Sequence, residues 1–134
     1  HMGATVDAFK ATHQTVVGLL EQIDSTGEQQ RVDALNSLKE VLLAHVGEEN
    51  NIILEAMDKP GAEGTFKPSA QRFMAELGDI AQIALMPFFD KYSSSEAVGS
   101  DDFANDFGGI KSALADRIAF EEGRFYPELE KLGF

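Results

Sequence analysis

Apolar residues recur every three to four positions along most of the chain, which is the spacing of helices with one buried face. Two such stretches cover residues 5–24 and about 28–58. A third begins near Pro68, which suits a first helical turn, and Pro87 is expected to kink or end it. A fourth ends near Leu129, and no alternating stretch indicates a strand. The pattern therefore predicts an all-α protein, an antiparallel up-down-up-down four-helix bundle.

Polar side chains interrupt the apolar faces of three of these predicted helices. His13 lies on the first, His45 and Glu49 on the second, and Arg117 and Glu121 on the fourth. His45 and Glu49 are one turn apart, so both point to the same side of their helix. Buried carboxylates are costly unless a cation or hydrogen-bond donors meet them, and a set of imidazoles and carboxylates suits iron, manganese or zinc. We therefore predict a metal site in the core.

Each of these residues also has a simpler interpretation. A single histidine on an apolar face, such as His13, is more often a hydrogen-bonded core residue than a ligand. The apolar stripes select Glu49 and Glu121 as the inward-facing acids, so we expect their neighbours Glu48 and Glu122 to face solvent.

Tyr92 and Tyr126 lie near the ends of predicted helices. Either tyrosine can donate a hydrogen bond near the site, but we expect both to be partly buried phenols that serve packing alone.

Size and composition fit one globular domain over residues 3–134, with His1 a cloning remnant and Met2 the start methionine. A net charge of −12 argues against nucleic acid and anionic membranes as partners. The absence of cysteine excludes thiolate metal sites and disulfides. No apolar run approaches about 18 residues and no signal-peptide pattern is present, so we expect a cytoplasmic protein.

The chain resembles the hemerythrin-like, or HHE cation-binding, domain family over almost its whole length. The resemblance rests on His13, on residues 45–49 and on residues 117–127. The last segment matches the family pattern of His, three residues, Glu-Glu, an aromatic pair and Pro, except that Arg117 takes the place of the histidine.

The resemblance implies a centre of two irons bridged by two carboxylates, with histidines of the first two helices on one iron and of the last two on the other. Carried over, His13, His45, Glu49 and Glu121 match the histidines of one iron and both bridges. Reversible oxygen binding normally uses both irons, so the incomplete set speaks against an oxygen carrier.

The ligands of the second iron are missing. The third predicted helix contains no histidine, although Gln71, Met74 and Glu76 lie near the expected place. Arg117 stays charged and is not a normal metal ligand, so we hypothesise that its guanidinium fills the space of the lost metal and offsets the charge of Glu121. The alternative is that Arg117 extends to the surface with only its stem buried.

We therefore expect one non-haem metal ion, iron ahead of zinc or manganese, in a domain that senses oxygen or nitric oxide, binds a small diatomic ligand or binds iron. The alternative is a metal-free, degenerate bundle in which Arg117 replaces the cation and which regulates a protein partner. An enzyme is less favoured, because the Glu-x-x-His pairs of di-iron oxidases and a Ser-His-Asp set are both absent.

Overall fold

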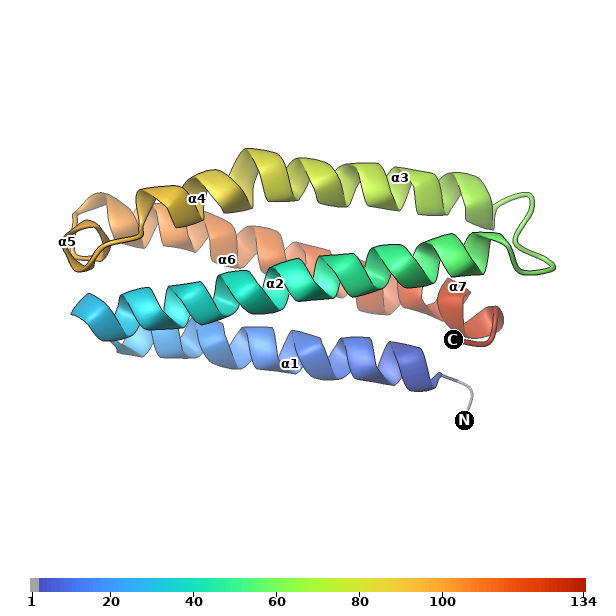
Figure 1. The fold of residues 1–134 in the computed structure, drawn as a ribbon, viewed down its shortest axis with the longest axis horizontal. Helices are drawn as coiled ribbons and strands as arrows, with labels where there is room; N and C mark the ends of the chain where they lie inside the picture. Colours follow the sequence, from blue (N-terminus) through green and yellow to red (C-terminus); the bar gives the residue numbers. More distant parts are fainter. Residues whose placement is uncertain (1–2) are drawn as a thin grey trace.

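The computed structural model describes residues 3–134, so the interpretation of His1 and Met2 lies outside the described residues. Within this range the chain is all-helical and forms no strand. Helices α1 (Ala4–Ser25) and α2 (Glu28–Met57) each agree with the predicted ranges to within one residue. The long helices lie lengthwise beside one another as a bundle (Figure 1).

Two further helical rods each consist of three consecutive segments. These are α3 (Phe66–Asp79), η1 (Ile80–Leu85) and α4 (Met86–Lys91) in the first rod, and α6 (Asp102–Phe120), η2 (Glu121–Phe125) and α7 (Tyr126–Lys131) in the second. The connection between the two rods contains a short helix, α5 (Ser95–Val98). The side chain of Ser94 caps α5, because its hydroxyl accepts a hydrogen bond from the Ala97 amide at 3.1 Å.

Each of these rods contains one π-helical turn, and a proline follows it. Pro87 and Pro127 are the second residues after η1 and η2. The turn in η2 closes with a hydrogen bond from the Tyr126 amide to the Glu121 carbonyl, which spans five residues instead of four. A proline ring clashes with the carbonyl four residues earlier in a regular helix, and we attribute the wider turn to relief of that clash. The helix therefore continues through Pro87 to Lys91 instead of ending there.

The core consists of two apolar clusters, one toward each end of the bundle. One cluster contains Val16 and Ile23 of α1 with Leu42 of α2, and the other contains Phe9 of α1 with Ile53 of α2. The buried polar residues lie between the clusters along each helix: His13 comes between Phe9 and Val16, and His45 with Glu49 between Leu42 and Ile53. The fold thus places one polar layer at the middle of an otherwise apolar core.

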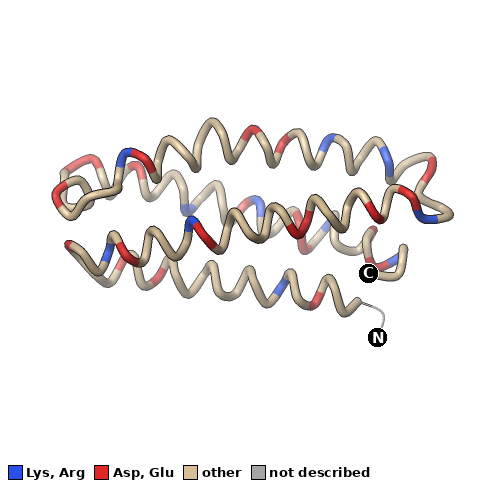
Figure 2. Tube along the Cα trace, viewed as in Figure 1, with Lys and Arg blue, Asp and Glu red and all other residues tan. Residues whose placement is uncertain are grey.

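Acidic residues occur on all the long rods and do not gather in one patch (Figure 2), in keeping with the net charge of −12. Within residues 3–134, no helix combines the length and the apolar character needed to cross a bilayer.

Candidate metal centre

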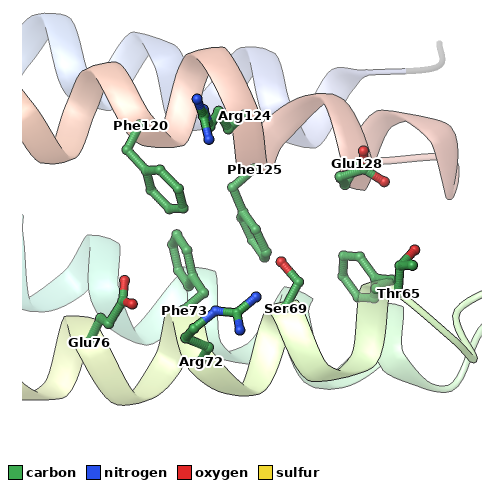
Figure 3. Close-up of a pocket in the computed structure, with 10 residues that line it drawn as sticks. Thr65, Ser69, Arg72, Phe73, Glu76, Phe120, Arg124, Phe125 and Glu128 are labelled. Atoms are coloured by element: carbon green, nitrogen blue, oxygen red, sulfur yellow. The ribbon is translucent and has the colours of Figure 1, made fainter.

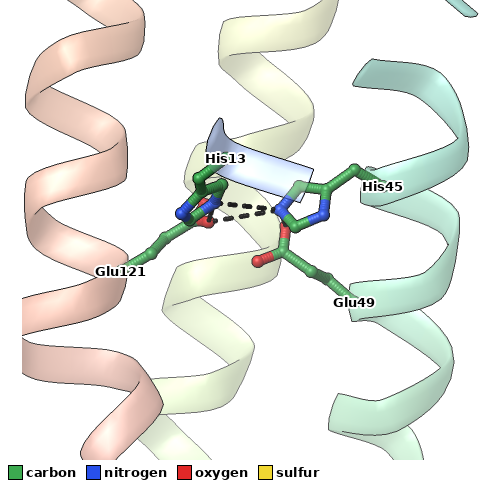
Figure 4. Close-up of side chains that lie close together, drawn as sticks. All are labelled: His13, His45, Glu49 and Glu121. Carbon is green, nitrogen blue, oxygen red and sulfur yellow. Dashed lines mark hydrogen bonds and ion pairs between the residues drawn. The ribbon is translucent and has the colours of Figure 1, made fainter. Parts of the chain in front are cut away.

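Three helical rods bring four buried polar side chains to one point in the polar layer. Helix α1 supplies His13, α2 supplies His45 and Glu49, and the first residue of η2 supplies Glu121 (Figure 4). Their exposed fractions are 3%, 5%, 1% and 2%, respectively. One ligand atom from each lies within 4.8 Å of the others, so the four side chains predicted from the sequence do come together.

The two imidazoles face each other through their Nε2 atoms. His13 Nε2 lies 3.1 Å from His45 Nε2 and 2.9 Å from Glu121 Oε1. His45 Nε2 lies 3.3 Å from Glu49 Oε1 and 3.5 Å from Glu121 Oε1. Two imidazole nitrogens and two carboxylate oxygens aimed at one dry point form a donor set that suits iron, manganese or zinc.

The hydrogen bonding within this group leaves one inward-facing atom unsatisfied. Glu49 Oε1 is fully buried and has no hydrogen-bond partner of acceptable geometry, although buried carboxylate oxygens are normally paired. A cation at the point of convergence supplies what this oxygen lacks, so the residues present fit a metal ion. His45 Nδ1, on the other edge of its ring, also has no partner.

Glu122 fixes the orientation of His13. Its Oε2 lies 2.7 Å from His13 Nδ1, so this ring nitrogen donates its proton to the carboxylate and Nε2 is left to face the centre. The Glu122 side chain is 36% exposed, so it is partly solvated as expected, but its contact with His13 was not predicted. A carboxylate behind the histidine is the usual support for a metal-binding imidazole.

Tyr126 is a second functional residue, and of its two interpretations the hydrogen-bond donor near the site is the one observed. It is fully buried, its hydroxyl lies 2.7 Å from Glu49 Oε2 and 2.9 Å from Glu121 Oε1, and its ring stacks on that of His13. The single hydroxyl proton serves one carboxylate at a time, so Tyr126 links the two acids. The expectation of a partly buried phenol at a helix end is therefore wrong for Tyr126.

The π turn explains why Tyr126 reaches the centre. In a regular helix, residues five apart point about 140° away from each other, so Tyr126 and Glu121 would diverge. The five-residue hydrogen bond of η2 brings them onto one face instead. The signal available in the sequence is Pro127, which in this chain follows a π turn just as Pro87 does.

Arg117 pairs with Glu121 inside the protein and does not extend to the surface. Its Nε donates to Glu121 Oε2 at 3.1 Å, Nη2 donates to the Phe73 carbonyl at 3.3 Å, and Nη1 lies 3.5 Å from Glu76 Oε2. The guanidinium carbon lies 4.1 Å from the centre of the Phe73 ring, and only 10% of the side chain is exposed. Of the two interpretations of Arg117, the buried ion pair is the one observed.

Apolar side chains occupy the face of the α3–η1 segment that points toward the centre. A cavity of about 30 Å³ lies beside the centre, and from this segment Leu77 and Ile80 line it, together with Leu85 at its end. Gln71 is exposed and Glu76 instead meets Arg117, so neither stands in for the missing histidines, and Phe73 and Leu77 take the buried positions.

The charges in this layer shift one another's titration. Burial opposes ionisation of Glu121, but hydrogen bonds from His13, His45 and Tyr126 outweigh it and lower the pKa of Glu121. Burial raises the pKa of Glu49. Burial also works against the charged form of His45, yet contacts with Glu121 and Glu49 raise its pKa to about 9. Burial, together with the charges of Glu49 and Glu121, raises the pKa of Tyr126, which remains a proton donor.

Comparison with known proteins agrees with this geometry. The family described as the hemerythrin HHE cation binding domain matches residues 4–129, nearly the whole chain. No curated protein and no solved structure matches the chain. The buried group of two histidines and two glutamates, which can hold a metal ion, lies within the matched residues. The chain belongs to the hemerythrin HHE cation-binding domain family.

Proposed function

We propose that this domain binds one metal ion, iron, through His13, His45, Glu49 and Glu121. The observation that carries the proposal is the convergence of their ligand atoms within 4.8 Å at a fully buried point. The unpaired Glu49 Oε1 and the carboxylate behind His13 support it. Nitrogen and oxygen donors favour iron, with zinc and manganese as competitors that the same donors accept.

A single ion follows from what surrounds Glu121. The guanidinium of Arg117 holds Glu121 Oε2 at 3.1 Å, on the side where the family places the second iron. The positive charge of Arg117 would repel a second cation there. Helix α3 also offers that cation no ligand, because the apolar side chain of Leu77 lines the cavity. We infer that Arg117 substitutes for the second ion as the counter-charge to Glu121.

We further propose that the centre senses or binds a small ligand instead of turning over a substrate. Bound iron supplies a redox-active Lewis acid. The chain's own residues supply a dry layer, a cavity of about 30 Å³ beside the ligands and one buried hydroxyl donor, Tyr126. That volume suits a diatomic molecule or one water.

Residues 3–134 form, in this proposal, one domain with an antiparallel up-down-up-down arrangement of four rods. The short connections between consecutive rods support that arrangement, because neighbours joined by short loops pack antiparallel.

The direct test is metal analysis of protein expressed in iron-rich medium and purified without chelator. We expect about one iron per chain and a metal-dependent absorption band that disappears in the double variant His13→Ala/His45→Ala. Two tightly bound ions per chain contradict the single-ion proposal. Binding that survives in the double variant contradicts the assignment of the ligands.

A second candidate function is a metal-free bundle that regulates a protein partner. It is favoured by the ion pair between Arg117 and Glu121 and by the hydroxyl of Tyr126, which together satisfy much of the buried charge without an ion. Thermal unfolding distinguishes the two functions. A melting temperature that does not change with Fe(II) or Zn(II), together with metal-free purified protein, favours this second candidate.

A further inference from the structure

A groove of about 500 Å³ separates α3 from the end of α6 and η2, apart from the metal ligands (Figure 3). It is lined by residues from both rods and none of the four proposed ligands belongs to it. Its volume lies in the range of pockets that hold small organic molecules, about 300–1,000 Å³.

The wall of this groove is aromatic. Phe73 of α3 and Phe125 of η2 stack with ring centres 4.0 Å apart and planes 14° apart, and both rings are buried. Phe66 and Phe120 extend the stack, with ring centres 5.9 Å from Phe125 and 6.2 Å from Phe73, respectively. Phe120, at one end of this stack, is partly exposed, and its ring favours a flat apolar ligand because aromatic pairs gain from contact beyond the area they bury.

Two arginines carry unmatched positive charge at the groove. Arg72 lies on the α3 side and Arg124 on the η2 side, and within residues 3–134 neither guanidinium has a hydrogen-bond or ion-pair partner (Figure 3). The two acids of the lining are already engaged, since Glu76 pairs with Arg117 and Glu128 pairs with Lys131 at 3.2 Å. The two arginines are therefore the groove's available donors for an anion.

We propose that this groove binds a small aromatic carboxylate. The ring lies against the partly exposed ring of Phe120, and the carboxylate lies between Arg72 and Arg124. The planar guanidinium matches a carboxylate with two parallel hydrogen bonds, which a lysine does not achieve. The hydroxyl of Ser69, on the same wall, offers one further donor.

The test is a titration of the 15N-labelled protein with 2-naphthoate, followed by NMR. We expect saturable amide shifts confined to the groove, at Ser69, Phe73 and Phe125 among others. The neutral isostere 2-naphthalenemethanol is expected to bind at least about tenfold more weakly, because it leaves both guanidiniums unpaired.

The matched variants separate specific recognition from overall charge. Arg72→Gln/Arg124→Gln is expected to weaken naphthoate binding by about tenfold or more, whereas Lys39→Gln/Lys67→Gln, which removes the same charge outside the groove, leaves it unchanged. All four side chains lie away from the buried core, so these variants are expected to fold. Equal binding by both double variants, equal binding of the neutral isostere, or shifts outside the groove overturn the proposal.

Discussion

The hydroxyl of Tyr126 donates a hydrogen bond to Glu49 at 2.7 Å and so ties the end of the last helical rod to the middle of α2. The same hydroxyl lies 2.9 Å from Glu121 Oε1. One phenol therefore supports the two acidic members of the proposed metal centre. This contact is the basis of the first prediction.

Tyr126→Phe is expected to destabilise the metal-free protein by about 1–3 kcal/mol, because it leaves a buried carboxylate short of a donor. Urea unfolding in the presence of EDTA measures this loss. The matched control is Tyr92→Phe, since Tyr92 is a buried tyrosine whose hydroxyl donates to Asp106, a carboxylate that remains partly exposed. We expect the smaller loss for Tyr92→Phe; equal losses contradict a special role for Tyr126.

Glu122→Gln is expected to weaken metal binding by about 10- to 100-fold, because the carboxylate that orients His13 becomes an amide. The free energy of unfolding of the metal-free protein changes less, because the Glu122 side chain is 36% exposed. Competition with a chromophoric chelator measures the affinity. Glu48→Gln is the control, as Glu48 is exposed and precedes Glu49 directly; similar losses in both variants argue against a positioning role for Glu122.

Arg117→His combined with Leu77→His is expected to raise the metal content from about one ion per chain toward two. The change removes the fixed charge beside Glu121 and adds imidazoles from α6 and α3 at the cavity that both residues line. Leu77→His alone is the control, and we expect it to stay at one ion because the guanidinium remains. Elemental analysis of the purified variants gives the answer, and a double variant that still binds one ion contradicts the role assigned to Arg117.

The stability of the metal-free protein is expected to fall as pH rises from about 6.5 to about 9. The folded pKa of His45 is raised to about 9, above the ordinary histidine pKa of about 6.5, so its contribution to stability is complete below pH 6.5 and is lost as the pH rises through 9. The contribution is on the order of 3 kcal/mol, and His13, whose pKa is also raised, acts in the same direction.

Metal binding is expected to show the opposite trend. A ligand imidazole must be neutral, so the affinity for Zn(II) or Fe(II) rises over the same pH interval. Urea unfolding at pH 6 and pH 9, with and without metal, measures both trends. Metal-free stability that is flat or rises across this interval contradicts the prediction.

The sequence predicted the helices and the inward-facing ligands well because both depend on the helical period. His13, His45, Glu49 and Glu121 fall on apolar stripes, and all four are buried together. The family assignment is confirmed over residues 4–129. That these four residues bind a metal remains a prediction.

The sequence failed where the helical period changes. Counting at 3.6 residues per turn past Glu121 gives Tyr126 no place at the centre, whereas the π turn at 121–125 brings it there. The apolar stripe likewise gives no sign that Glu122, beside Glu121, contacts His13. The sequence also does not show what replaces the lost ligands of the third helix, because apolar residues in such positions carry no chemical signal, and Gln71, Met74 and Glu76 merely lie near the expected place.

The two π turns also bear on how an ion enters a point that the folded bundle closes off. One π turn, η1, lies in the α3–α4 rod, and the other, η2, lies in the α6–α7 rod. Two grooves, one lined by Phe73 and one lined by Phe88, run along the boundary between these rods. Irregular turns interrupt the regular backbone hydrogen bonds of a helix, so we expect local opening and amide exchange to be easiest along this boundary. We therefore expect the speed of metal loading to depend on how readily the bundle opens at the two π turns.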